Sequence, residues 1–323
     1  MLDSILASLK VVTLATKVNF RSVNMREVAL FEGSIGWGEF SPFLEYGFEE
    51  CVPWLVSAVE AAFVVVEPPL RSEIEVNATL PAIDNYGEIS QLLDTFEGVS
   101  AVKIKVGGNL ALDLARIESV RQLRPKARIR IDVNGLWSVE QAHQFLAQVG
   151  EIEYVEQPCS TLEELRELKL RTSVKIVGDE VIRKASNPFN IDLTDAVDMV
   201  MLKVAPLGGV TRALEIAKHH QLPVVVSSAL ESAVGISHGL KLAAAVPELG
   251  FASGLGTGSL LADDLAHLPI IGGKIKLTNV EPDIQALNNF AVSADRLNWW
   301  KNRVQMVWTS GALEEIEKRG WRI

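Results

Sequence analysis

Short segments rich in β-branched residues recur along this chain at a nearly constant interval, and this spacing restricts the folds open to it. Each segment ends in polar or small residues, and from the second onward they begin about every 24 residues. The eight segments are Val76–Pro81, Ala101–Val106, Ala127–Val133, Ile152–Gln157, Val174–Glu180, Asp198–Val204, Leu222–Ser228 and Gly250–Leu255. We predict a β-strand in each of them.

The stretches between these segments have helical patterns. Leu110–Arg124 places apolar residues on one stripe, and Ser138 with Gln141 forms a capping-box pattern before a helix over Val139–Val149. Further helices are predicted for Thr161–Leu170, Gly209–His220 and Val234–Val246. Strand and helix alternating at a short period indicate βαβ units, and eight strands favour a barrel. The rival fold, a doubly wound open sheet, usually has a GxGxxG motif after its first strand, and nothing after Pro81 resembles it.

The two flanks of this repeat have a different character. Alternating segments before residue 49 predict an antiparallel meander, followed by a helix from about Glu49 to Val66. The tail contains one strand candidate, Lys274–Leu277, and a probable helix over Ala294–Trp308. We therefore expect an α+β domain over residues 1–75 and a barrel over 76–270. The segment 271–323 is expected to pack back on one of them.

Composition excludes several classes of partner. The 323 residues include 31 Lys and Arg against 41 Asp and Glu, a net charge of −10, which disfavours nucleic acids and anionic membranes. Two cysteines, Cys51 and Cys159, are too few for a disulfide framework. The start reads as no signal peptide, and the apolar run near Ala61–Val66 is too short to cross a bilayer. A cytoplasmic protein, monomeric or a small homo-oligomer, is expected.

Charged residues stand at the ends of five successive predicted strands, where the active site of a barrel lies. They are Lys103 and Lys105, Asp132, Glu156, Asp179 with Glu180, and Lys203. The three carboxylates at 132, 156 and 179 are 24 and 23 residues apart, one in each βα unit. Neighbouring carboxylates repel unless a cation lies between them, and hard oxygen ligands suit Mg²⁺. The alternative is that each carboxylate caps a helix.

The lysines suggest proton chemistry. Lys103 and Lys105 are two residues apart, so their side chains share one face of a strand. Burial and mutual repulsion would lower the pKa of both, as a lysine base needs. The alternative is an exposed edge strand. Lys203 is expected across the barrel, so that metal and ammonium charges could stabilise an enediolate formed next to a carboxylate.

Weaker candidates surround this group. Asn134 could orient a ligand or shape the turn, and Arg130 could pair with Asp132. Ser227 and Ser228 could bind the distal part of a substrate or cap the next helix. The Gly254–Gly258 segment could offer backbone amides to an anion, or could simply form a tight turn.

These motifs resemble the muconate-lactonizing subgroup of the enolase superfamily. The resemblance rests on KIK at 103–105, RIDVNGLW at 130–137, YVEQP at 154–158, VGDE at 177–180, LKVAPLGG at 202–209 and SSALES at 227–232. It implies a modified (β/α)7β TIM-like barrel with an α+β capping domain. It also implies Mg²⁺, for which Mn²⁺ can substitute, bound by Asp132, Glu156 and Asp179. A lysine base with Mg²⁺ is an established pattern of that superfamily.

Two N-terminal phrases, residues 20–33 and 36–46, resemble dehydratases of menaquinone biosynthesis within this subgroup. The resemblance implies a syn elimination of water from 2-succinyl-6-hydroxy-2,4-cyclohexadiene-1-carboxylate (SHCHC). Lys105 would remove the α-proton and protonate the departing hydroxide, Lys203 would stabilise the enediolate, and Lys103 would assist. Residues Phe20–Arg26, with Arg26 as a substrate contact, and Phe40–Tyr46 would close over the succinyl part.

Other functions remain open at this point. N-acylamino acid racemases and dipeptide epimerases of the same superfamily share every catalytic residue named above and begin with the same proton abstraction. A binding protein on an inactive barrel would lack at least one lysine or carboxylate of the set, and none is missing.

Overall fold

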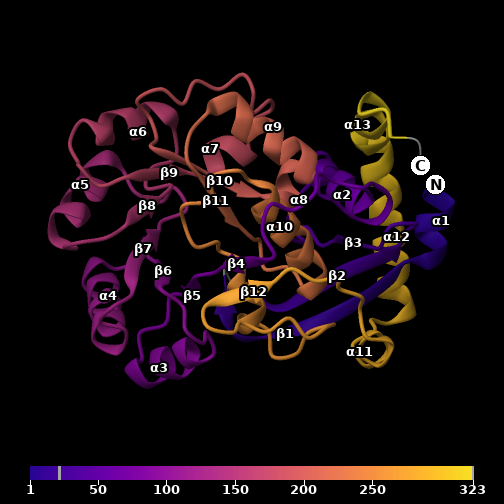
Figure 1. Cartoon of the computed structure of the whole chain (residues 1–323), viewed down its shortest axis with the longest axis horizontal. Coiled ribbons are helices and arrows are strands. Elements are labelled where there is room, and N and C mark those ends of the chain that lie inside the picture. The colour runs from indigo at the N-terminus through magenta and orange to yellow at the C-terminus, as the bar shows by residue number, and fades with distance from the viewer. Residues whose placement is uncertain (21–22, 322–323) are drawn as a thin grey trace.

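The centre of the molecule is a curled parallel sheet. The computed structural model describes residues 1–20 and 23–321. Its sheet consists of β5 (Ala78–Leu80), β6 (Ala101–Lys105), β7 (Arg128–Asp132), β8 (Tyr154–Glu156), β9 (Ile176–Gly178), β10 (Met199–Lys203) and β11 (Val224–Ser227). The strands lie side by side in sequence order and are parallel (Figure 1). Seven of the eight predicted strands are thereby confirmed.

The eighth predicted segment closes the ring without forming a regular strand. Ser253 makes a parallel bridge to Val76, just before β5, and Gly254 makes one to Ser227 of β11. The segment is short and glycine-rich, and glycine weakens a strand because it has no side chain to pack. The sheet is therefore a barrel whose last position is held by two bridges.

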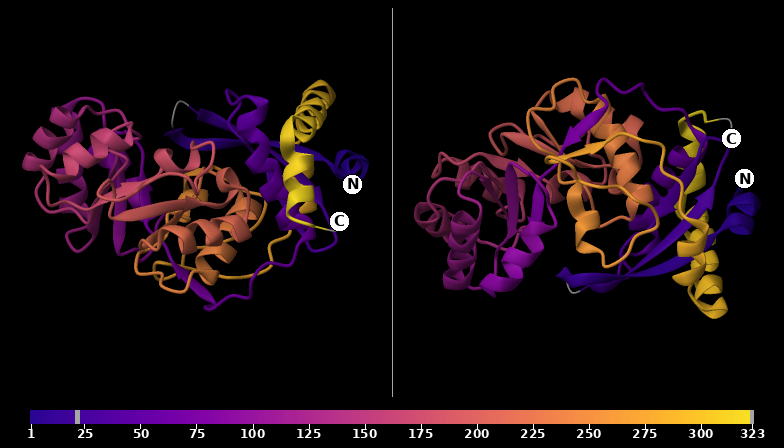
Figure 2. Two further views of the ribbon diagram at one scale, coloured as in Figure 1. Left: turned by 90° about the horizontal axis from the view of Figure 1, so that it is seen from above. Right: turned by 60° about the horizontal axis from the view of Figure 1, so that its bottom comes forward.

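Helices connect the strands and cover the outside of the sheet (Figure 2). They are α3 (Tyr86–Asp94), α4 (Leu110–Leu123), α5 (Val139–Gln148), α6 (Leu162–Lys169), α7 (Glu180–Arg183), α8 (Val204–Leu207), α9 (Val210–His220), α10 (Ala233–Ala245) and the 3₁₀ turn η1 (Gly256–Leu260). The capping box of Ser138 and Gln141 is present. The apolar stripe of α4 is incomplete, because Leu110 is exposed in the first turn while Ile117 and Val120 are buried.

The N-terminal region forms a separate layer beside the barrel. It comprises α1 (Leu2–Ser8), the antiparallel strands β1 (Lys10–Phe20), β2 (Val23–Glu32) and β3 (Trp37–Phe40), and helix α2 (Phe48–Phe63). The sheet and α2 pack closely, since a Cβ at Gly38 would lie 2.1 Å from the carbonyl oxygen of Ala58. The predicted meander and helix are both present, with the helix ending at Phe63 instead of Val66.

The C-terminal segment returns to the N-terminal layer. Strand β12 (Lys274–Lys276) pairs with β4 (Glu73–Glu75), and α11 (Ile284–Asn289), α12 (Ala294–Val307), the π-helical turn η2 (Trp308–Ala312) and α13 (Leu313–Lys318) follow. In Figure 1, α12 and α13 stand beside α2 and β3. The ring of Trp300 meets that of Phe40 edge-on, with centroids 5.8 Å apart. The domain boundaries at residues 75 and 270 stay a prediction.

A buried carboxylate of α2 joins the N-terminal layer to the barrel. Glu60 is fully buried and accepts hydrogen bonds from the backbone amides of Val210 and Thr211, at the first turn of α9. His238 of α10 lies 3.2 Å from the same carboxylate. A negative charge at a helix N-terminus is favourable, because the first amides of a helix lack partners within it. Among the described residues, no helix is long and apolar enough to cross a membrane.

Candidate active site

The charged residues predicted at the strand ends lie in one row. Lys105 of β6 is in register with Asp132 of β7, and Asp132 is in register with Glu156 of β8. Asp179 directly follows β9, and Lys203 is the last residue of β10. A parallel sheet presents the carboxyl ends of all its strands at one edge, so a constant βα period brings these side chains together.

The three lysines and three carboxylates form one buried ion network. Lys105 Nζ contacts the Asp132 carboxylate and donates to Asn134 Oδ1 at 2.7 Å. Lys103 Nζ lies 2.7 Å from Glu156 Oε2, and Lys203 Nζ lies 2.5 Å from Asp179 Oδ2. Lys203 also approaches Glu156 Oε1 at 3.6 Å. Lys103 and Lys203 therefore lie near different carboxylate oxygens of Glu156.

The pKa values of the two lysines of β6 are shifted in opposite directions. Burial lowers the pKa of Lys105, and the nearby charges of Lys103 and Lys203 add to this effect despite the attraction of Asp132. Burial also disfavours the charged form of Lys103, but the attraction of Glu156 and Asp132 outweighs it and raises the pKa of Lys103. The expectation of a lowered pKa is thus wrong for Lys103, because its nearest partners are carboxylates and not Lys105.

The pKa values of the carboxylates Asp132 and Glu156 are also shifted in opposite directions. Burial alone would raise the pKa of Asp132, but the lysines, Lys105 first, outweigh it and hold the pKa of Asp132 below its usual range. Burial and then the charge of Asp132 raise the pKa of Glu156. The pKa of Asp179 falls to about 2, because Lys203 and Arg183 outweigh the effect of burial.

The donor set fits a hard dication in its chemistry. Asp132, Glu156 and Asp179 are buried on adjacent strands, and Glu156 Oε1 has no hydrogen-bond partner among the described residues. In their present positions, no three Asp, Glu, His or Cys side chains of the described chain form a group that could hold a metal. Ammonium groups lie among the carboxylates as the counter-charge. Buried oxygen ligands on adjacent strands are the kind that Mg²⁺ takes.

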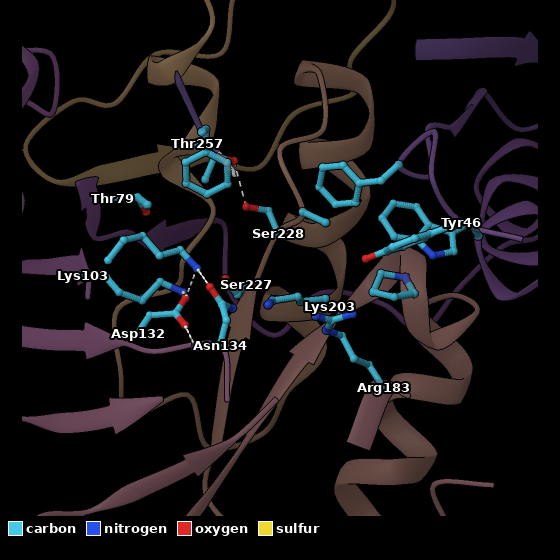
Figure 3. A pocket seen from close by; sticks show the side chains of 16 residues that line it. Tyr46, Thr79, Lys103, Asp132, Asn134, Arg183, Lys203, Ser227, Ser228 and Thr257 are labelled. Atoms are coloured by element: carbon cyan, nitrogen blue, oxygen red, sulfur yellow. Dashed lines mark hydrogen bonds and ion pairs between the residues drawn. The ribbon is translucent and has the colours of Figure 1, made fainter. Parts of the chain in front are cut away.

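A cavity opens onto this row (Figure 3). Lys103, Lys105, Asp132, Asn134 and Lys203 line it from the barrel. Aromatic residues of the N-terminal layer, Phe20, Phe43, Tyr46 and Trp54, line the other side. The expected loop Phe20–Arg26 includes residues 21–22, which lie outside the described residues. The cavity has a charged floor and an apolar wall, as small-molecule sites commonly do.

Only some of the weaker candidates line the cavity. Ser227, Ser228 and Asn134 line the cavity, whereas Gly254 and Arg26 do not. Ser228 Oγ donates to the Gly254 carbonyl oxygen at 2.6 Å and lies 2.8 Å from Thr257 Oγ1. Arg130 does not pair with Asp132. It donates instead to Glu153 at 2.5 Å, to Asn77 at 2.9 Å and to the Ala252 carbonyl oxygen at 2.6 Å, deeper in the barrel.

Sequence reasoning missed several lining residues, of which Arg183 is the most polar. Trp54, Thr79 and Pro206 also line the cavity without having been singled out. Arg183 ends the one-turn helix α7 and pairs through Nε with Asp179 Oδ1 at 3.1 Å and through Nη2 with Glu180 Oε1 at 2.7 Å. Its spacing of four residues from Asp179 was an available signal, because positions i and i+4 share a helix face.

Arg26 belongs to a buried cluster between the N-terminal sheet and the barrel. Its Nε donates to the Leu230 carbonyl oxygen at 3.0 Å, and its guanidinium lies 4.6 Å from the centroid of the Phe43 ring. Glu39 of β3 accepts from Ser232 Oγ at 2.6 Å and from the Gly235 amide at 2.8 Å, at the start of α10. These contacts fix the loop that follows β11. Arg26 therefore contacts residues next to the cavity, or lining it, without lining the cavity itself.

Glu231 in this cluster makes stability depend on pH. The side chain is buried, and burial, with the charge of Glu39, raises the pKa of Glu231 to about 7. A raised pKa means that the native state binds the proton more tightly than the unfolded state. The stabilisation is complete below the unfolded value near 4.5 and is lost as the pH rises through about 7.

Between pH 5 and pH 8, the free energy of unfolding of the parent should therefore fall by about 2–3 kcal/mol more than that of Glu231→Gln, which has no carboxyl group at this position. Urea unfolding of both proteins at the two pH values measures the difference. Asp264, whose pKa is raised to about 6 by burial, is present in both proteins and cancels. The same pH dependence in parent and variant would contradict the assignment.

Comparison with known proteins supports the same reading of the chain. A family model described as enolase C-terminal domain-like matches residues 89–277, more than half of the chain, and one described as enolase N-terminal domain-like matches residues 11–62. The o-succinylbenzoate synthase of Mycobacterium ulcerans is 46% identical over 311 residues, covering 94% of both chains. That of Mycolicibacterium smegmatis is 45% identical over 310 residues, covering 94% of this chain and 96% of the relative.

The chain belongs to the o-succinylbenzoate synthase family of the enolase superfamily. Solved structures of the superfamily share its fold. A muconate lactonizing enzyme from Pseudomonas fluorescens aligns with a TM-score of 0.74 at 19% identity, over 88% of this chain and 98% of that one. An N-succinyl Arg/Lys racemase from Bacillus cereus aligns with a TM-score of 0.74 at 20% identity, over 88% and 97%. The predicted family and the predicted barrel with a capping domain are confirmed for this member of the synthase family.

Proposed function

We propose that this protein is an o-succinylbenzoate synthase, a lyase that removes water from SHCHC to give 2-succinylbenzoate. The observation that carries the proposal is the 43–46% identity to synthases over 94% of the chain. It is joined by a cavity lined by Lys103, Lys105, Lys203 and Asp132, with Glu156 and Asp179 paired to two of these lysines. A small carboxylate would fit this floor, because the three ammonium groups balance the three carboxylates and the proposed Mg²⁺ would make the floor positive.

The residues of the floor would divide the reaction between them. Lys105 would take the proton from the carbon that bears the ring carboxylate, and then return it to the departing hydroxide, so that water leaves. Lys203 would lie on the opposite face and stabilise the enediolate by its charge. Lys103 would hold the carboxylate end of the substrate near Lys105. The aromatic wall would exclude bulk water, which strengthens these charge interactions.

A magnesium ion is part of the proposal. We assign Asp132, Glu156 and Asp179 as its ligands, with Mn²⁺ able to substitute. When bound, the ion would supply positive charge for the substrate carboxylate and for the charge that develops on it. Its support is the chemistry of three buried carboxylates, one of which has an oxygen without a hydrogen-bond partner among the described residues.

The magnesium assignment predicts the effect of one substitution. Asp179→Asn should weaken Mg²⁺ binding at least about tenfold, since it removes a charged ligand. Isothermal titration with Mg²⁺, supported by the rise in melting temperature on adding the ion, measures this. Asp198→Asn is the matched control, because Asp198 is only half-buried and pairs with Lys169 at 2.9 Å, away from the cavity. Equal Mg²⁺ affinity in parent and Asp179→Asn would refute the ligand assignment.

Two assays run in parallel test the function. The first follows the loss of SHCHC absorbance, and the second follows the optical rotation of an N-acylamino acid. Dehydration of SHCHC supports the synthase. Turnover of only the amino acid derivative would overturn the proposal in favour of a racemase or dipeptide epimerase, whose chemistry uses the same floor residues.

The proposal includes a place for the protein in the cell. We propose a role in menaquinone biosynthesis, in the cytoplasm, with a small-molecule substrate and a monomeric or small homo-oligomeric state. Cys51 and Cys159 are free and buried, in keeping with a reducing compartment.

A further inference from the structure

The four cationic side chains that line the cavity among the described residues come from β6, β10 and α7. The ammonium groups of Lys103 and Lys105, from β6, pair with Glu156 and Asp132. Arg183 enters from α7, on the side of Lys203 and Tyr46 (Figure 3). Among the described residues that line the cavity, Arg183 is the one cation that does not come from the strand ends of β6 or β10.

Two of the three guanidinium nitrogens of Arg183 have hydrogen-bond partners among the described residues. Its side chain is 6% exposed, and Nε and Nη2 bind Asp179 and Glu180. No hydrogen bond of Nη1 is found within the described residues, so Nη1 is left for a ligand. Guanidinium groups bind carboxylates through two parallel hydrogen bonds when the geometry allows, and their position is preorganised when other bonds already fix it.

The substrate of the proposed function has two carboxylates. The ring carboxylate must lie near Lys105, because the proton to be removed is on the adjacent carbon. The carboxylate of the succinyl chain is several bonds away and would lose its hydration in the cavity, which is costly without a partner of opposite charge. Phe43, Trp54 and Pro206, which also line the cavity, have no charge to offer.

The position of Arg183 suits an extended chain. Arg183 and Pro206 line both the cavity and a groove on the outside of the molecule, between α2 and α7. A side chain of the substrate that extends from the ring toward the surface would therefore meet Arg183. The serines expected to bind this part are less suited, because Ser228 Oγ is already within hydrogen-bond distance of Gly254 O and Thr257 Oγ1.

We propose that Arg183 is a specificity-determining residue that binds the second carboxylate of a dicarboxylate substrate through its free guanidinium nitrogen. This inference rests on the proposed function, since it assigns a subsite within the same cavity. The competing role is purely positional, in which Arg183 only orients Asp179.

A pair of ligands separates the two roles without turnover. One is o-succinylbenzoate, and the other is 2-butyrylbenzoate, in which a methyl group replaces the terminal carboxylate. With Mg²⁺ present, calorimetry should show the parent protein binding o-succinylbenzoate at least about tenfold more tightly, as for a hydrogen bond between charged groups. In Arg183→Gln this preference should fall below about threefold, with the affinities for Mg²⁺ and 2-butyrylbenzoate changed by less than about threefold.

Other outcomes overturn the inference. A parent protein without preference between the ligands would do so, and so would an Arg183→Gln variant that keeps the preference. Equal weakening of both ligands together with weaker Mg²⁺ binding would show the positional role. Arg183→Lys keeps the positive charge but not the planar, forked guanidinium, and should retain an intermediate preference for o-succinylbenzoate. Arg212→Gln, in the outer groove but not the cavity, is the matched control and should leave the preference unchanged.

Failure of the inference can be told apart from failure of the proposed function. A parent protein that dehydrates SHCHC, with an Arg183→Gln variant that keeps the ligand preference, refutes only the role of Arg183. A parent protein that does not dehydrate SHCHC, with a preference that depends on Arg183, refutes the synthase and supports the carboxylate subsite.

Discussion

Lys105→Ala is expected to lower kcat for SHCHC dehydration by about 10³-fold or more, because it removes the group that takes and returns the proton. Lys105 lines the cavity, and its side chain is more exposed than that of Lys103, at 14% against 6%. Initial rates at saturating substrate measure the effect. Lys126→Ala, at an exposed lysine that precedes β7 and so lies at the other end of that strand from Asp132, should leave the rate unchanged.

Two further observations separate lost chemistry from a disturbed site. Asp132 would keep Lys103 as a partner at 3.6 Å, so Lys105→Ala should still bind Mg²⁺ and 2-succinylbenzoate. A small primary amine added to the solution should restore part of the rate, since it can occupy the space and carry the proton. A variant that retains more than about a tenth of the parent rate would show that another group is the base.

Lys203→Ala is expected to have an effect of similar size for a different reason. Its ammonium lies at the opposite side of Glu156 from Lys103, and in the proposed reaction it stabilises the enediolate without moving a proton. Removing one such preorganised charge should lower kcat by about 10²–10³-fold. Dehydration assays measure the loss, and near-normal rates would show that Lys203 does not lie beside the enediolate.

Hydrogen exchange distinguishes this role of Lys203 from that of a second base. In deuterated water, Lys105 alone can exchange only the α-proton that faces it. If Lys203 only stabilises the enediolate, the parent should exchange one enantiomer of an N-acylamino acid, and Lys203→Ala should slow that exchange. Exchange of both enantiomers by the parent, with loss of only one of them in Lys203→Ala, would contradict the proposed role and favour a 1,1-proton transfer.

The part of the site that could be predicted from the sequence is the part set by regular spacing. Parallel strands with a constant period place their carboxyl ends at one edge, so Lys105, Asp132 and Glu156 had to lie near one another. The same reasoning identified Lys203 at the end of β10. Contacts between the layers could not be read in this way, because they join segments with no shared period.

Arg26 and Arg183 show that limit. Arg26 was expected to contact substrate, but its guanidinium binds the Leu230 carbonyl oxygen about two hundred positions along the chain. Arg183 was not expected, although it lines the cavity. The direction of a long side chain depends on which neighbours satisfy its charge. For Arg26 these include the Leu230 carbonyl oxygen, in the loop after β11. For Arg183 they are the nearby Asp179 and Glu180, and only the fold shows that this side chain lines the cavity.

The sequence by itself determined the family, the barrel and the row of charged residues at the strand ends, since periodicity and local motifs depend on residues that are close along the chain. Only the tertiary structure decided how the pKa values within that row are shifted. Lys103 and Lys105 are equivalent in the sequence pattern, yet the pKa of one is raised and that of the other lowered. Burial and the nearest opposite charge set this difference, and both arise only when distant strands meet.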